Sequence, residues 1–106
     1  MEGLSYEEFG NGIVVKRLIF EDKRVMLFIT DCDKFGSLYK VGGREGVRQL
    51  LGDTERSKLH YPILLALEQK LKRDPSERSN SMLVSIAVRD SSKLTQLLKD
   101  LPRLSW

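Results

Sequence analysis

Asp31, Cys32 and Asp33 are adjacent in the sequence, and they are the residues whose types could do chemistry together. Two carboxylates around a thiol could bind a metal ion or begin a catalytic site. A metal site needs at least three converging ligands, and hard cations prefer several oxygens. Neighbours on a strand point to opposite faces, so Cys32 cannot share a face with both carboxylates. Asp and Gly are favoured in turns, so residues 31–36 are predicted to form a turn between two strands.

Cys32 and His60 are the single cysteine and the single histidine of the chain. A zinc site would hold at most these two residues and distant carboxylates, because no Cys-x-x-Cys pair exists. A nucleophilic Cys32 would need His60 as its base, and no local spacing brings them together. A lone cysteine beside an apolar strand is more often a small core residue. The sequence thus predicts no enzyme, catalytic residue, metal site or cofactor, while His60 either caps or packs against a helix.

The glycine-rich stretch over residues 42–46 is the second candidate site. It lacks the Gly-Lys-Ser/Thr ending of a phosphate-binding loop and is not part of a strand–loop–helix unit with the right spacing. Its glycines predict a flexible surface loop, and such loops often carry binding contacts. We therefore predict Gly43, Arg44 and Arg48 as partner-binding residues, with the two arginines available to acidic groups on a partner.

Length and composition limit the class of protein. A chain of 106 residues is long enough for one domain with its own core. One cysteine excludes an intramolecular disulfide and therefore a secreted disulfide scaffold. The acidic N-terminus lacks the apolar segment of a signal peptide, and no apolar run reaches the roughly 18 residues of a membrane-spanning helix. The prediction is a single cytoplasmic domain over residues 1–106, with no membrane contact.

The net charge of +3 is small, and the basic residues are interleaved with Asp and Glu. This distribution indicates a solvated mixed surface and is a poor footprint for nucleic acid.

Apolar and β-branched runs predict most of a sheet. Two of these runs flank a short charged break over residues 21–24, which is the pattern of a β-hairpin. The second run has no polar alternation, which is typical of a central strand buried on both faces. Residues 47–51 are either a further strand or an extended connection. The predicted strands are residues 6–9, 13–20, 25–30, 37–41 and 82–88.

Leucine spacing predicts two helices. Pro62 suits the first helical position, where its missing N–H needs no partner, and Asp74-Pro75 ends this helix. Asp90 supplies a cap for the second helix, which Pro102 ends. The order of elements predicts an α+β fold: a mostly antiparallel sheet of five to six strands, with both helices on one face. The two apolar stripes are Ile63, Leu64, Leu67 and Leu71, then Leu94, Leu97, Leu98 and Leu101.

Three stretches, in their order and spacing, carry a resemblance to a known family. An apolar strand ends at Thr30 and is followed by Lys-Phe-Gly-Ser-Leu at residues 34–38. Leu-Leu-Gly-Asp-Thr at residues 50–54 precedes a helix, and Val-Ser-Ile-Ala-Val-Arg-Asp at residues 84–90 precedes a leucine helix and Trp106. Together they resemble the small proteasome assembly chaperones 3 and 4. The first and third stretches are closer to chaperone 3, and the second is closer to chaperone 4.

The resemblance implies a heterodimer of two related chaperones that promotes formation of the α-subunit ring of the proteasome core particle, without a cofactor. In chaperone 3, a loop after the corresponding strand approaches α-subunits. The matching segment here is residues 42–49, which is shorter than in the family. The resemblance leaves open which of the two chaperones the chain matches, and whether the chain pairs with itself.

The alternative drawn from the residues is a small α+β RNA-binding domain. Sheet-type RNA binders stack bases on exposed strand aromatics that lie beside basic residues. Phe20, Phe28 and Tyr39 are the candidates for that role, although core packing explains Phe20 and Phe28 better.

Overall fold

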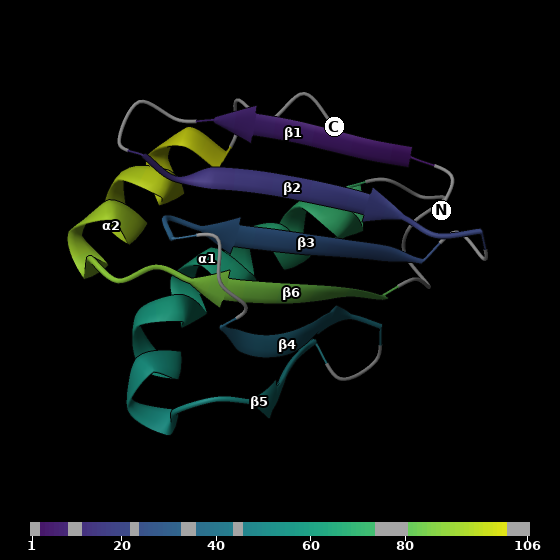
Figure 1. Cartoon of the computed structure of the whole chain (residues 1–106). Helices are drawn as coiled ribbons and strands as arrows, with labels where there is room; N and C mark the ends of the chain where they lie inside the picture. Colours follow the sequence, from purple (N-terminus) through teal and green to yellow (C-terminus); the bar gives the residue numbers. More distant parts are fainter. Residues whose placement is uncertain are drawn as a thin grey trace.

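The described residues form one six-stranded sheet with two helices on the same side of it, as the computed structural model in Figure 1 shows. The structure describes residues 3–8, 12–21, 24–32, 36–43, 46–73 and 81–101. The predicted α+β fold with a mostly antiparallel sheet is therefore confirmed. The strands are β1 (Gly3–Glu8), β2 (Val14–Ile19), β3 (Val25–Thr30), β4 (Ser37–Gly42), β5 (Val47–Leu51) and β6 (Ser81–Ala87), and the helices are α1 (Thr54–Arg73) and α2 (Ser91–Asp100).

The strand order is β1-β2-β3-β6-β4-β5, so β6 lies between two strands that precede it in the sequence. The predicted hairpin is confirmed, because β2 and β3 pair antiparallel from Val14↔Thr30 to Ile19↔Val25. The β3–β6 pair is parallel, whereas β4 pairs antiparallel with β5 and β6. Residues 31–36 do connect two strands, but those strands are not neighbours. The end of β6 lies between the end of β3 and the start of β4, since Thr30 pairs with Ala87 and Ser37 pairs with Ile86.

β3 is a central strand, as its apolar run predicts, because it lies between β2 and β6. The prediction that β3 is buried on both faces is wrong. Leu27 and Ile29 are fully buried on the side of the helices, whereas Met26 and Phe28 alternate with them and are only half-buried. The run is continuously apolar because one face packs against the helices and the other is an apolar surface.

The core lies between the sheet and the two helices. Along β6, Met82, Val84 and Ile86 belong to the core, whereas Leu83 and Ala87 are half-buried and Ser85, on the same side as these two, is buried. Both leucine stripes contribute to the same core, although Leu98 of the second stripe is 36% exposed. The core residues of the helices and of the segment after α2 are Ile63, Leu64, Leu67, Leu94, Leu97 and Leu101.

The first helix begins eight residues before the predicted start at Pro62, so that prediction is wrong. Asp53 caps the helix: its Oδ1 accepts the N–H of Glu55 at 2.8 Å, and its carbonyl accepts the N–H of Ser57 at 3.1 Å. Pro62 therefore lies inside the helix, where it removes one backbone hydrogen bond without ending it. α1 ends at Arg73, and the predicted stop at residues 74–75 lies outside the described residues.

The remaining boundaries agree more closely. Asp90 caps α2 as predicted, because its Oδ1 accepts the N–H of Ser92 at 3.0 Å and the hydroxyl of Ser92 at 2.7 Å. Residues 47–51 form the edge strand β5, and the predicted strand over residues 6–9 corresponds to β1, which begins earlier. Pro102 and Trp106 lie outside the described residues. Neither described helix is long and apolar enough to cross a membrane.

Candidate functional site

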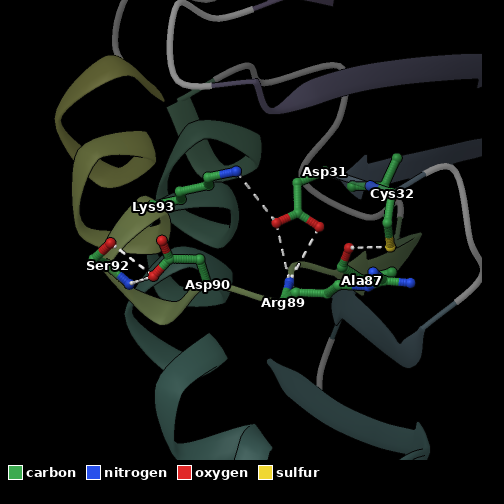
Figure 2. Close-up of polar contacts among 8 residues, drawn as sticks. Asp31, Cys32, Ala87, Arg89, Asp90, Ser92 and Lys93 are labelled. Carbon is green, nitrogen blue, oxygen red and sulfur yellow. Dashed lines mark hydrogen bonds and ion pairs between the residues drawn. The ribbon is translucent and has the colours of Figure 1, made fainter.

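Asp31 lies at the end of β3, where it reaches the start of α2 (Figure 2). Its two carboxylate oxygens each accept the backbone N–H of Arg89 at 3.1 Å, and Lys93 Nζ lies 3.6 Å from Oδ2. The Asp31 side chain is 4% exposed. The carboxylate therefore joins the end of β3 to the segment between β6 and α2.

The ionised form of Asp31 is the one this environment stabilises. Burial raises the pKa of the carboxyl group, but the N–H groups of Arg89 and Asp90, the Cys32 side chain and the charge of Lys93 together lower it below 3.8. A carboxylate with both oxygens engaged by the protein is poorly placed to bind a metal or transfer a proton. The geometry assigns Asp31 a structural role.

Cys32 follows Asp31, and its side chain points toward Ala87 at the end of β6 (Figure 2). Its thiol donates to the carbonyl of Ala87 at 3.4 Å, and its N–H donates to the Thr30 hydroxyl at 3.0 Å. The Cys32 side chain also lies close enough to Asp31 to lower the pKa of its carboxyl group, because both residues follow the end of β3, where strand alternation does not apply. Asp33 lies outside the described residues. Among the residues that the structure describes, no three His, Cys, Asp or Glu side chains converge as a metal site.

Replacing Asp31 with Asn is expected to lower the free energy of unfolding by about 1–3 kcal/mol, because the buried side chain loses its ion pair with Lys93 and one of the two oxygens that accept the N–H of Arg89. Since the pKa of Asp31 is lowered on folding, its contribution is present above pH 3.8 and is lost as the pH falls through the folded value. The difference between wild type and Asp31→Asn should therefore shrink in acid. Urea unfolding at several pH values measures this.

Asp53→Asn is the matched control, because Asn caps a helix about as well as Asp and position 53 is exposed. Its change should stay within a few tenths of a kcal/mol. Equal stability losses in both variants at neutral pH would contradict the structural role of Asp31.

His60 lies within α1 and points from the helix toward β4, so it does not cap the helix. Its Nδ1 lies 2.7 Å from the hydroxyl of Tyr39 on β4, and the two rings meet edge to face. Both side chains are almost fully buried. Burial lowers the pKa of His60, as does the nearby charge of Arg56, and burial raises the pKa of Tyr39. The imidazole is thus engaged by Tyr39, whereas the Cys32 thiol bonds at the end of β6.

The β4–β5 hairpin carries two of the three predicted partner-binding residues. Gly43 is exposed with φ +71°, and Arg48 is exposed on β5 at the register position opposite Lys40. Arg44 lies outside the described residues. The N–H of Gly42 donates to the carbonyl of Gly46 at 2.7 Å, which closes the hairpin.

The sheet surface opposite the helices is called the open face below. One row of register partners across it runs Leu18–Met26–Leu83–Lys40–Arg48, and the next runs Lys16–Phe28–Ser85–Leu38–Leu51. Strand alternation places these rows on the side away from the core, and Leu51 joins the second row through the register shift between Leu38 and Tyr39. Ser85 in that row is buried, and its hydroxyl accepts the N–H of Gly36 at 3.1 Å. No helix in the described part of the chain lies over this face (Figure 1). The apolar members of these rows are Leu18, Met26, Phe28, Leu38, Leu51 and Leu83.

Contiguous apolar surface of this kind marks an interaction site in many proteins. The unbroken apolar run of β3 is the sequence signal for this surface. It was interpreted above as a strand buried on both faces. The fold and this surface together define a small α+β domain with one covered and one open sheet face. Comparisons of the chain with protein-family models, curated proteins and solved structures gave no match.

Proposed function

We propose that this chain is a non-catalytic assembly chaperone of the cytoplasm, of the kind represented by proteasome assembly chaperones 3 and 4. It pairs with a related small chaperone and holds proteasome α-subunits in position while their ring forms. The apolar open face is the observation that carries the proposal. The three stretches that resemble the family supply the identity of the proposed partners.

The open face suits a second sheet better than a small ligand. Two sheets pack face to face about 10 Å apart, with side chains of the two faces interdigitating. Leu18, Met26 and Leu83 are neighbours on three adjacent strands, so they present one continuous apolar strip. Each Å² of apolar surface that such packing removes from water contributes about 25 cal/mol. A related partner offers a similar face, which makes the pair pseudo-symmetric.

The β4–β5 hairpin lies at the edge of this face and is the proposed contact for α-subunits. Arg48 and Lys40 place two positive charges at the outer end of one open-face row. Charged groups at the rim of an interface mainly raise the association rate and select the partner. Moderate affinity also suits a chaperone that must leave the finished ring.

A tagged pull-down from cell extract with mass spectrometry tests the proposal. The expected result is recovery of a second small chaperone with proteasome α-subunits and without mature β-subunits. Recovery of neither would overturn the proposal. The same experiment with Arg44→Glu and Arg48→Glu combined is expected to reduce α-subunit recovery by about tenfold, because reversed rim charges slow association.

Dimerisation should survive in that double variant, because the apolar strip is unchanged. Lys58→Glu combined with Lys99→Glu is the matched control: both lysines are exposed on the helices and the change in net charge is the same. If the hairpin variant and the helix variant lose α-subunits equally, the hairpin is not the contact and only net charge matters.

RNA binding is the second candidate, and one observation favours it. Phe28 lies directly opposite Lys16 on the open face, which places an aromatic ring beside a positive charge. Tyr39 is buried under α1 and cannot stack on a base, and Phe20 is 39% exposed at the end of β2. Nuclease-sensitive material in the pull-down, with binding that weakens steeply as salt rises, would favour this candidate.

A further inference from the structure

The first nine residues of α1, residues 54–62, make few buried contacts with the sheet. His60 is the one buried side chain among the nine, and Ser57 is half-buried. The other seven side chains are exposed. Directly after this segment the pattern changes, because Ile63, Leu64 and Leu67 all belong to the core. The packing of the first two turns on β4 therefore depends on His60.

The contact that His60 makes is specific. Its Nδ1 lies 2.7 Å from the Tyr39 hydroxyl, and the ring centroids are 5.7 Å apart at an angle of 89°. When the Tyr39 hydroxyl donates, Nδ1 must be the unprotonated nitrogen of a neutral imidazole. Protonation makes both ring nitrogens donors and places a charge in a site that is 3% exposed. A buried charge without a paired counter-charge is strongly unfavourable.

None of the described groups named below places a negative charge beside a protonated His60. Arg56, one turn earlier on α1, is itself positive and opposes protonation of the ring. From β4 the neighbours are Tyr39 and Ser37, which bond each other. From β5, Gln49 holds the register position opposite Tyr39 and does not titrate.

The remaining charged groups near this layer are engaged elsewhere. On α2, Lys93 pairs with Asp31. The buried carboxylate of α1, Glu68, lies against Gly46: a Cβ at that glycine would be 2.7 Å from Glu68 Oε2. The groups around His60 are thus the positive Arg56 and the neutral Tyr39 and Gln49, and none of them stabilises a protonated imidazole.

Pro62 separates this segment from the rest of the helix. It has no N–H, so the carbonyl of Lys58 lacks its usual partner four residues later. Two further local bonds are exposed: the N–H of Glu55 donates to Asp53 Oδ1, just ahead of the segment, and the hydroxyl of Ser57 donates to the carbonyl of Thr54. A helical segment this short is not stable in water without its contact to the sheet, so its backbone hydrogen bonds open on release.

We propose that residues 54–62 are a pH-sensitive arm, docked on β4 by neutral His60 and released from the sheet when the imidazole is protonated, with Pro62 as the hinge. The arm does not depend on the function proposed above. Because the pKa of His60 is lowered on folding, docking is complete above about pH 6.5. It weakens as the pH falls from there toward the folded value.

Hydrogen exchange of the full chain from pH 8 to pH 5, expressed as protection factors, tests the proposal. Protection of the amides of residues 58–61 should fall by up to about tenfold for each pH unit below 6.5, because one proton is taken up on release. Protection of β3 and β6 should stay constant. In His60→Gln, whose amide can still accept from Tyr39 but cannot titrate, the response of residues 58–61 should disappear.

Three results would overturn the proposal: no pH response in wild type, an equal response in His60→Gln, or simultaneous loss of protection in β3 and β6. If His60→Gln does not fold, the wild type still decides the question. His60 is the single histidine, so its imidazole NMR signals are unambiguous. Because docking lowers the pKa of His60, the midpoint of their titration must lie below pH 6.5, where protection has already begun to fall. A midpoint at about pH 6.5 would refute the arm.

Discussion

Replacing Gly36 with Ala should destabilise the domain by about 3 kcal/mol or more, one of the largest effects expected of a single methyl group in this fold. A Cβ at position 36 would overlap the carbonyl oxygen of Ile86, and it would lie 2.6 Å from the Ile86 carbonyl carbon and 2.7 Å from Ala87 Cα. These are backbone atoms of β6, which is paired on both sides with β3 and β4. Neither β4 nor β6 can move apart from the other without breaking hydrogen bonds of the sheet.

Urea unfolding of wild type and Gly36→Ala measures the loss. Gly3→Ala is the matched control, because the added methyl group would meet only the side chain of Ile19, at 3.7 Å. Its effect should stay within about 0.5 kcal/mol. If the two variants were equally stable, Gly36 would not lie against the backbone of Ile86 and Ala87.

The turn around Gly36 is predictable from the sequence, whereas the contact of this glycine with β6 is not. The residue types at Asp31 and Gly36 predict a turn, and a turn between two strands is what local chemistry can specify. The insertion of β6 between β3 and β4 brings together residues about fifty positions apart, and no local pattern encodes that. Gly36 is needed for the close approach to β6, which only the strand order reveals.

Local signals predicted the elements more reliably than their partners. The strand β6 and the Asp90 cap are encoded within a few residues, and both are confirmed. The start of α1 was also encoded locally, by Asp53 ahead of Thr54 and Glu55, but Pro62 is a stronger signal and gave the wrong start. The bond between Tyr39 and His60 joins two elements, so neither residue predicts it alone.

The candidate site was predictable only in part. The glycines of residues 42–46 predict an exposed hairpin, and Gly43 and Arg48 are exposed. Their proposed contact with a partner remains a prediction. The open face was missed because an apolar run has the same pattern whether a helix, a partner chain or water lies over it. Only the placement of both helices on one side distinguishes these cases.

The second large effect is expected at the open face: Phe28→Asp should weaken pairing with the related chaperone by at least about 2 kcal/mol, or roughly 30-fold in Kd. Phe28 lies on the central strand β3, between Lys16 of β2 and Ser85 of β6. A carboxylate there would replace an apolar ring and would be taken out of water by the partner sheet, and an ion pair with Lys16 in that setting does not repay the cost of desolvation. Sedimentation of the mixed chaperones over a concentration series measures the change.

Leu65→Asp is the matched control, since Leu65 is an equally apolar, 39% exposed residue on α1, on the helix side of the sheet. It should leave pairing unchanged, and thermal unfolding of each variant alone shows whether its monomer is folded. Folded Phe28→Asp that still pairs at wild-type affinity would remove the open face from the interface. Loss of pairing in Leu65→Asp instead would move the interface to the helices. The two substitutions therefore distinguish which side of the sheet receives the partner.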